Sequence, residues 1–474
     1  MNKDLVIIIL GRVLQTVIML ASIRLLTTYL SPKEVGNYYS ILSILTFFNL
    51  VLLNPPGMYF SRNLLKWKIS GDLFNVLSVF IIWMLFVSIL SVPISIYFYN
   101  VLEYNQRFDL NLFLIYMFFA IFISTIHRNV LYGTNTLGFR KEFVYYLLIT
   151  LITGLLFSIY IVLYHNDSAL GWLIGIVISE FLILPIIFNF FLQKNRLDFR
   201  KIRTFFSKKR IKILLSFTIP IGVTTFLMWG QIAAYRFIID YKYSVEVLAY
   251  IAVGISVSSA VFTSIESISM QYFNPIFLKK ILNATKKERT IAWNNIAKQV
   301  VPIYILTVFF TISMAEVLIN ILVDNKFHDS YIYTMIGVGI DFFRVMSNLL
   351  NNVAQSEYKT KSTVKPYLVG FIVSLGLLSS MDFNTNYSMI PIVLVTAYFL
   401  VYVYMYTIMK KILDIKYDIE IVKIIFLSLP FSSIYFIDIP MTDIVFNLAV
   451  LFIFGVYFLF VLWLLHKNHL KGNR

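Results

Sequence analysis

Several arginines lie inside long apolar runs, where a guanidinium is costly unless water or an anion faces it. Arg12 and Arg24 interrupt the run that begins at Leu5, and Arg236 and Arg344 interrupt two later runs. Placing a charged side chain at the centre of a membrane helix costs about 2.5–3.5 kcal/mol on insertion scales. Arginine also binds phosphate oxygens through two parallel hydrogen bonds. These arginines therefore predict a wet, cationic cavity within the membrane that suits an anionic ligand.

Structural roles remain open for three of these side chains. Arg12 lies about 10 Å into its span, so the alternative is a side chain that extends back to the interface. Arg24 and Arg236 lie nearer the outer ends of their spans, where the alternatives are a salt bridge to Glu34 or Glu246 and a side chain that extends to the interface.

Two more arginines lie at or near the cytoplasmic ends of predicted spans. Arg62 follows the Asn54-Pro55-Pro56-Gly57 stretch and is expected to cap the second span, where it would guard the inner mouth of the cavity. Arg128 stands beside His127 in the inner third of its span, and anchoring at the interface is the alternative to binding. The prolines indicate either a hinge or a simple kink.

Three carboxylates within the spans are candidates for ion coupling. Asp341 and Arg344 are three residues apart and share a helix face, so a local ion pair is the alternative. Glu180 lies near mid-depth without a partner nearby in sequence, which suits either a coupling proton or a protonated carboxyl bonded to a neighbouring helix. With Glu266, these residues are expected to bind a proton or a sodium ion, and no other cofactor or metal is expected.

The composition indicates an all-α integral membrane protein. The chain has 474 residues, of which 59% are hydrophobic and 14% charged, against roughly 25% charged residues in soluble domains. Apolar runs of about 20 residues are typical of transmembrane helices. Fourteen spans are predicted, at residues 5–30, 35–61, 72–99, 110–133, 143–164, 169–192, 211–240, 245–271, 299–323, 331–356, 366–382, 387–409, 419–437 and 443–465.

The distribution of basic residues predicts the orientation. If the N-terminus is cytoplasmic, the outer segments hold only Lys33, Arg107, Lys242 and Lys326, and most other Lys and Arg residues fall in inner segments. Both termini are therefore expected to be cytoplasmic. The basic stretch 194–210 is expected to contact anionic lipid headgroups, and no nucleic-acid-binding fold accompanies it.

An internal repeat predicts two lobes. Arg24, Glu34-Val35 and Tyr38 recur with the same spacing as Arg236, Glu246-Val247 and Tyr250, at an offset of 212 residues. Two six-helix halves related by an axis along the membrane normal are a common plan for alternating-access transporters. The expected division is an N-lobe at 1–193, a basic linker at 194–210, a C-lobe at 211–412, and an appended hairpin with a cytoplasmic tail at 413–474.

At this point several stretches resemble the Wzx-type polysaccharide flippases. They are Arg12-Val13-Leu14, Arg24-Leu25-Leu26 through Tyr38, Gly57 to Arg62, Phe217-Thr218-Ile219-Pro220, and Arg236 to Tyr250. This family is grouped with the lipid II flippase and multidrug exporters in the multidrug/oligosaccharidyl-lipid/polysaccharide (MOP) exporter superfamily. Members often carry an acid beside the arginine of the seventh span, and Tyr235 takes that place here.

The resemblance implies a fold of twelve core helices with optional extra spans, in a bacterial cytoplasmic (inner) membrane. A central cationic cavity would move undecaprenyl-diphosphate-linked oligosaccharide, such as an O-antigen repeat unit, to the outer leaflet. Gln231 and Tyr235 are expected to contact the sugar. A monomer is expected, with membrane lipids and polysaccharide polymerase or assembly proteins as partners.

Two other functions remain alternatives. A multidrug exporter of the same fold would favour an acidic cavity for cationic drugs, whereas the candidates here are mainly basic. A membrane polysaccharide polymerase or ligase would need a sizeable outer loop with catalytic residues, and the predicted outer loops are short. The sequence has no cysteine, five scattered histidines and no glycine-rich phosphate loop, so no enzyme activity is expected.

Overall fold

The computed structural model describes residues 3–195, 208–281, 284–357, 359–384, 386–417, 419–441 and 443–472. The regular secondary structure of these residues is helical throughout, and no strand occurs among them. The contacts divide the chain into two compact units, Met1–Glu246 and Val247–Arg474. Residues 196–207 of the predicted basic linker lie outside the described residues.

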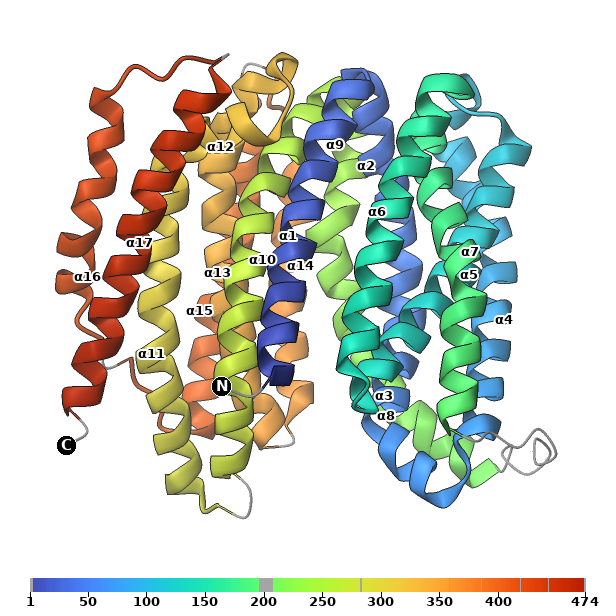
Figure 1. Ribbon diagram of the computed structural model, residues 1–474, viewed down its shortest axis with the longest axis horizontal. Helices are drawn as coiled ribbons and strands as arrows, with labels where there is room; N and C mark the ends of the chain where they lie inside the picture. The colour runs from blue at the N-terminus through green and yellow to red at the C-terminus, as the bar shows by residue number, and fades with distance from the viewer. Residues whose placement is uncertain are drawn as a thin grey trace. The chain divides into compact units, whose positions relative to one another are not determined.

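Unit 1 is a bundle of long helices (Figure 1). Its elements are α1 (Lys3–Tyr29), α2 (Pro32–Phe47), the π-helix η1 (Phe48–Leu53), α3 (Asn54–Ser70), α4 (Leu73–Val101), the 3-10 turn η2 (Tyr104–Gln106), α5 (Leu110–Thr136), α6 (Arg140–Tyr164), α7 (Ala169–Asn195), α8 (Lys208–Trp229), the π-helix η4 (Gly230–Ala234) and α9 (Tyr235–Lys242). α10 then begins at Val245 and leads into unit 2.

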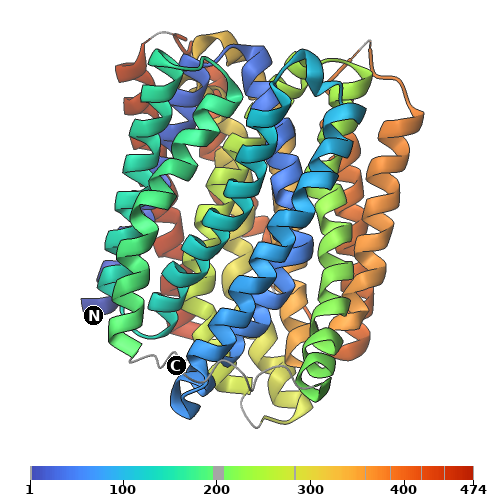
Figure 2. The same cartoon turned by 90° about the vertical axis from the view of Figure 1, so that its right-hand side faces the viewer.

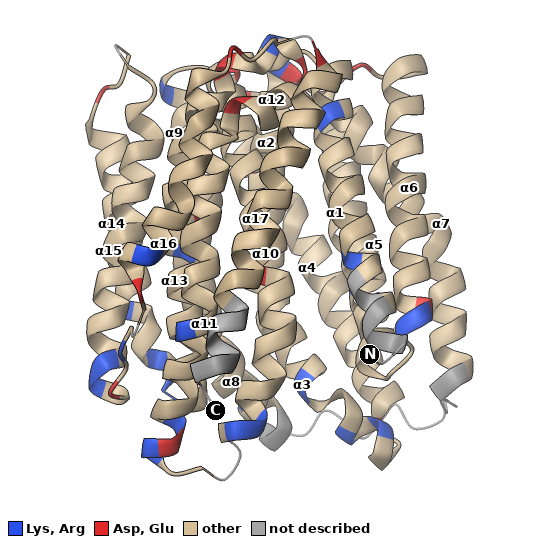
Figure 3. Ribbon diagram, turned by 60° about the vertical axis from the view of Figure 1, so that its left-hand side comes forward, with Lys and Arg blue, Asp and Glu red and all other residues tan. Residues whose placement is uncertain are grey.

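Unit 2 holds the remaining helices. Its elements are α10 (Val245–Ile281), α11 (Lys286–Ser313), α12 (Ala315–Leu322), the 3-10 segment η5 (Asn325–Ser330), α13 (Tyr331–Ser356), η6 (Thr360–Thr363), α14 (Val364–Ser380), α15 (Met389–Ile412), α16 (Ile421–Ser428), the 3-10 segment η7 (Leu429–Phe436) and α17 (Ile444–Gly472). Lys and Arg residues lie where α10 ends and α11 begins, which is the predicted cytoplasmic end (Figure 3).

The predicted all-α membrane fold with about fourteen helices is confirmed. Twelve helical segments of the described chain are long and apolar enough to cross a membrane. α13 has 26 residues but is too polar to count among them, and α16 with η7 forms a shorter apolar segment. These two segments correspond to the predicted spans 331–356 and 419–437. The protein is therefore a multi-pass integral membrane protein.

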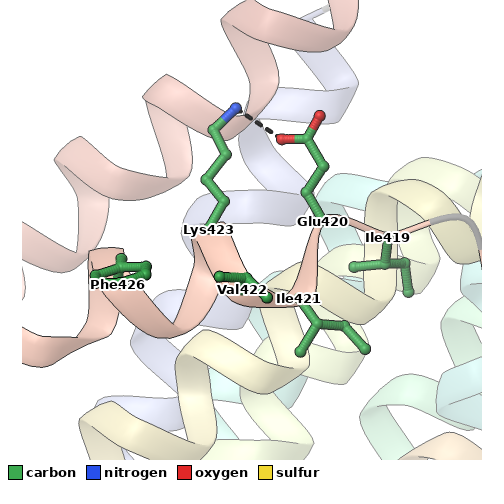
Figure 4. Close-up of a pocket in the computed structure, with 6 residues that line it drawn as sticks. All are labelled: Ile419, Glu420, Ile421, Val422, Lys423 and Phe426. Carbon is green, nitrogen blue, oxygen red and sulfur yellow. Dashed lines mark hydrogen bonds and ion pairs between the residues drawn. The ribbon is translucent and has the colours of Figure 1, made fainter.

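The first helix of the predicted hairpin has few residues, and half of them form a 3-10 helix, which rises further per residue than an α-helix. Eight α-helical and eight 3-10 residues give a rise of about 28 Å, close to the hydrocarbon thickness of roughly 30 Å. At the start of α16, Glu420 and Lys423 form an exposed ion pair of 2.9 Å (Figure 4). The shallow surface pocket around this pair is otherwise lined by apolar side chains such as Val422 and Phe426.

Local signals account for several helix starts. Ser31 caps α2 by accepting from the Glu34 N–H, and Asp109 caps α5 by accepting from the Leu112 N–H. Thr285 and Glu288 form a reciprocal capping box at α11. These caps satisfy backbone donors that would otherwise lack partners at the helix ends.

The helices differ in detail from the predicted spans. α10 extends to Ile281 and α11 begins at Lys286, so both helices continue beyond the predicted spans 245–271 and 299–323. The stretch Asn54-Pro55-Pro56-Gly57 does not end the helix, since the prolines occupy the first turn of α3, where no helical N–H is needed. The contacts group the seventh span (α8, η4 and α9) with unit 1, and the predicted division into lobes at 194–210 stays a prediction.

Close helix packing in unit 1 depends on small residues. α6 and α7 lie side by side (Figures 1 and 2), and Ser158 donates a 2.7 Å hydrogen bond to the Trp172 carbonyl. A Cβ at Gly175 would come within 2.3 Å of the Ser158 nitrogen. A Cβ at Gly36 of α2 would come within 2.0 Å of the Val245 carbonyl oxygen. Any side chain at these glycines would force the paired backbones apart.

Candidate functional site

Arg236 opens α9 directly after the π-helix η4 and reaches toward α2. Its Nη1 atom lies 3.5 Å from both the Tyr39 carbonyl oxygen and the Ser43 hydroxyl. Its Cζ atom lies 5.1 Å from the Tyr39 ring centroid and 5.7 Å from that of Tyr235. The half-buried guanidinium makes no ion pair with Glu246 or any other described carboxylate. A hydroxyl, a carbonyl and two aromatic faces therefore hold this cation in place without neutralising it.

A hydrogen bond from a tryptophan indole links the segment before Arg236 to the second span. Trp229, the last residue of α8, donates a 2.9 Å hydrogen bond to the Ser43 carbonyl. A second indole, that of Trp83, donates to the Leu52 carbonyl within η1 at 3.1 Å. π-Helical turns shift the regular backbone hydrogen bonds and often occur at functional sites. The Trp229 bond thus holds the end of α8 against α2, directly before the π-helix η4 that leads to Arg236.

Arg12 faces α6 from α1. Its Nη1 donates to the Gln15 side-chain oxygen at 2.8 Å, and its Cζ lies 5.8 Å from the Phe143 ring centroid. The side chain is half-buried, and its Nε has no hydrogen-bond partner within the described chain. No described carboxylate pairs with it. Arg24, also half-buried, lies near the end of α1.

Arg128 of α5 is exposed and donates to the Asn49 side-chain oxygen at 3.1 Å. Asn49 belongs to η1, so Arg128 and Arg236 both contact the second span. Ser43 and Asn49 are six residues apart, about 9 Å along a helix. The structure therefore brings Arg128 and Arg236 to one helix. Arg62, further along α3, is exposed.

Gln231 and Tyr235 are buried, with 1% and 2% of their surfaces exposed. Gln231 lies within η4 and donates to the Leu227 carbonyl at 3.4 Å. Neither side chain presents an open surface to a sugar in this conformation. Their predicted role as sugar contacts stays a prediction.

A polar network at the outer end of unit 1 was not expected from the sequence. Arg107, between α4 and α5, forms a 2.9 Å ion pair with Asp240 of α9. Asp240 also accepts a hydrogen bond from Ser40 at 3.0 Å, and the Tyr104 hydroxyl donates to Ser40 at 2.6 Å. Burial raises the pKa of Tyr104, and the negative charge of Asp240 raises it further, so the phenol stays a donor. One available signal was that Asp240 lies one turn after Arg236.

Glu34 and Glu180 take part in separate bonds within unit 1. The Glu34 carboxylate accepts from the Ala169 backbone N–H at 2.7 Å and from the Asn37 amide at 2.9 Å. The Glu180 carboxylate on α7 accepts from the Ser124 hydroxyl on α5. Glu180 thus sits at the α5–α7 contact and forms no ion pair with a described cation.

In unit 2, Arg344 lies between two carboxylates. It contacts Asp341 at 3.0 Å and Glu266 of α10 at 3.1 Å. The predicted local pair of Asp341 and Arg344 is therefore present, and Glu266 joins it. Ser258 donates to Asp341 at 2.8 Å, and Asn348 donates to Glu266 at 2.8 Å. Each guanidinium nitrogen of Arg344 has a partner in this conformation, and its predicted role in binding the cargo stays a prediction.

The fold resembles that of solved membrane transporters. A structure of the lipid II flippase MurJ in an inward closed conformation is 14% identical, covers 99% of both chains and gives a TM-score of 0.68. An inward-facing multidrug resistance MATE family transporter of the MOP superfamily is 10% identical, with a TM-score of 0.59 over 85% of this chain and 94% of the other. A ligand-bound structure of the MATE multidrug transporter DinF-BH is 14% identical, with a TM-score of 0.54 over 87% and 94%.

At these identities the likeness shows a shared fold. No protein-family model matches the chain, and no curated protein matches it in sequence.

Proposed function

We propose that this protein is a flippase that moves undecaprenyl-diphosphate-linked oligosaccharides from the cytoplasmic to the outer leaflet of a bacterial cytoplasmic membrane. The observation that carries the proposal is that three arginines on membrane helices form no ion pair with a described carboxylate: Arg12, Arg128 and Arg236. A guanidinium kept within the membrane without a carboxylate is costly unless water or an anionic ligand faces it. A diphosphate supplies that anion, and arginine binds it through paired hydrogen bonds.

The fold shared with a lipid II flippase supports this substrate class. The charged headgroup would need a polar route across the membrane because its transfer into hydrocarbon is prohibitive. The polyprenyl chain would remain in lipid. Arginines that bind the diphosphate would offset part of this transfer cost. The site would open first to one side of the membrane and then to the other.

A coupling ion is part of the proposal. Asp341 and Glu266 share one arginine, so this cluster carries one net negative charge when both acids are ionised. Glu180 has a hydroxyl partner and, within the described chain, no ion-paired cation. An excess negative charge within the membrane is most stable when a proton or sodium ion balances it. We therefore propose that one of these acids binds the coupling ion.

The cationic arginines weigh against export of cationic drugs, although MATE transporters share the fold. Like charges in a cavity of low dielectric constant would repel such a ligand. The solved proteins of similar fold are transporters and a flippase, which supports a role outside catalysis.

The test is transport in proteoliposomes. Purified protein would be reconstituted with a fluorescent undecaprenyl-diphosphate-linked oligosaccharide, and outward movement would be read by an impermeant quencher. We expect Arg236→Ala to lower the rate by about tenfold or more, since a charge-assisted hydrogen bond contributes about 1.5–3 kcal/mol. Arg236→Lys should retain part of the rate.

Lys423→Ala is the matched control, because Lys423 is an exposed cation at the start of α16. Its rate should equal that of the wild type. Wild-type protein that moves no lipid-linked oligosaccharide, or an Arg236→Ala variant with full activity, would refute the proposal.

A further inference from the structure

α13 carries a stripe of polar side chains along one face. Asp341, Arg344 and Asn348 are followed on the same face by Asn351, Asn352 and Gln355. Relative to Asp341 these positions lie 3, 7, 10, 11 and 14 residues on, which at 3.6 residues per turn keeps them within about 100° of one another. From Asp341 to Gln355 the stripe spans about 21 Å, more than half of a hydrocarbon core of roughly 30 Å. It is too long to be only the cytoplasmic edge of a span.

In the C-terminal half of α13, residues 345–356, the pattern of buried and exposed side chains is the reverse of that expected for a helix that faces lipid. The polar stripe there holds the more exposed side chains, with Asn351 and Asn352 half-buried and Gln355 exposed. The other faces hold buried apolar residues, namely Val345, Met346, Leu349, Leu350, Val353 and Ala354. Amides exposed to lipid would be costly, so this face of unit 2 is adapted to water or to a polar ligand.

The N-terminal part of the stripe, which is Asp341, Arg344 and Asn348, differs in its hydrogen bonds from the C-terminal part, which is Asn351, Asn352 and Gln355. Arg344 donates to Asp341, and Arg344 and Asn348 both donate to Glu266 of α10. The hydroxyl of Ser258 on α10 donates to Asp341. In the described part of the chain, Asn351 and Gln355 have no hydrogen-bond partner, and the Nδ2 donor of Asn352 has none either, although that atom is buried. The C-terminal part of the stripe therefore offers, chiefly at Asn351 and Gln355, uncharged donors and acceptors that no described group of the protein bonds.

We infer that Asn351, Asn352 and Gln355 form a binding subsite for the glycan part of the cargo. The inference rests on the proposed flippase function and deepens it. A carboxamide both donates and accepts hydrogen bonds, which matches the neighbouring hydroxyls of a sugar. An uncharged stripe is a poor site for a diphosphate, which requires cations. Gln231 and Tyr235 are buried in this conformation, so the subsite is a second surface for the sugar, and their own predicted role stays a prediction.

The test compares two ligands on one variant. The variant is Asn351→Leu/Asn352→Leu, which keeps side-chain size but removes the amides. One ligand is the lipid-linked oligosaccharide extracted from cells that make the natural cargo, and the other is undecaprenyl diphosphate without sugar. We expect the variant to bind the glycosylated lipid about 10- to 30-fold more weakly, since two or more hydrogen bonds to the sugar are lost. Binding of undecaprenyl diphosphate should change less than about twofold, because the removed amides contact only the sugar.

Asn189→Leu is the matched control, since Asn189 is an exposed amide on α7 of unit 1. It should bind both ligands as the wild type does. If the double variant misfolds, Asn351→Ala and Gln355→Ala are measured singly, with the thermal midpoint as the check on folding. Equal weakening of both ligands, or of neither, would overturn the subsite. Wild-type protein that binds neither lipid would refute the proposed function itself.

Discussion

At the scale of single residues, the arginines separate into two groups by their partners. Arg107, Arg289 and Arg344 form ion pairs of 2.5–3.1 Å with carboxylates. Arg12 and Arg236 are held by amide, carbonyl, hydroxyl or aromatic groups, which leave the positive charge uncompensated. We propose that the first group stabilises the fold and that the second group is available to an anion. This contrast is the physical basis of the proposed function.

The buried pair of Arg107 and Asp240 gives a prediction about stability. The Asp240 side chain is 1% exposed, so Asp240→Ala leaves a partly buried guanidinium without its partner. Removing one member of a buried pair costs about 3–5 kcal/mol. We expect a lower thermal unfolding midpoint in detergent, with Arg107→Ala/Asp240→Ala less destabilised than the sum of the single variants. Additive effects would show that the pair contributes no coupling energy.

The sequence could predict contacts between near neighbours but not between distant ones. Asp341 and Arg344 lie three residues apart, so their pairing follows from helix geometry. Arg107 and Asp240 are separated by 133 positions, and their pairing depends on how α9 packs against the connection between α4 and α5. Glu266 joins Arg344 from another helix for the same reason. The sequence therefore indicates individual candidate residues, but it cannot show which distant residues they contact, because those contacts depend on the fold.

At the scale of elements, hydropathy located the membrane helices well. The predicted span 110–133 corresponds to α5, Leu110–Thr136, and 443–465 corresponds to the start of α17, Ile444–Gly472. It missed the helical extensions beyond the membrane, because α11 begins with the polar residues Lys286, Lys287 and Glu288, whose capping signal is local. The length of an apolar run reflects the thickness of the hydrocarbon core, whereas the residues at which a helix begins and ends depend on its capping groups.

Two glycines offer a paired test of helix packing. A Cβ at Gly36 would lie 2.0 Å from the Val245 carbonyl oxygen, whereas a Cβ at Gly376 of α14 would meet no atom within 4 Å. Gly36→Ala must therefore separate α2 from the start of α10 and lower the unfolding midpoint. Gly376→Ala should be neutral or stabilising by about 0.5–1 kcal/mol, because alanine favours the helix. Equal midpoints for the two variants would contradict this packing.

At the scale of the whole molecule, the predicted two-lobe plan and the observed units differ at one span. The predicted boundary was the basic linker 194–210, and the observed units meet after Glu246. α8 and α9 are held in unit 1 by Trp229, Arg236 and Asp240, which bond to Ser43, Tyr39 and Ser40 of α2. A sequence repeat indicates which spans are equivalent, but side-chain bonds decide which unit a connecting span joins. The lobe assignment itself stays a prediction.

The orientation can be tested directly because the sequence contains no cysteine. Single cysteines at Lys326, in η5, and at Lys361, in η6, lie in a predicted outer and a predicted inner segment. We expect an impermeant maleimide to label the first in intact cells and the second only after permeabilisation. Labelling in the opposite order would invert the proposed direction of transport.

The most direct measurement is the binding of undecaprenyl diphosphate to the purified protein by native mass spectrometry. Arg12→Ala/Arg128→Ala/Arg236→Ala removes the three uncompensated cations, and Lys410→Ala/Lys416→Ala/Lys423→Ala removes three basic residues of unit 2 as the control. We expect the arginine variant to lose at least about tenfold in affinity, while the lysine variant binds as the wild type does. Unchanged binding by the arginine variant would contradict the claim that these arginines hold the diphosphate.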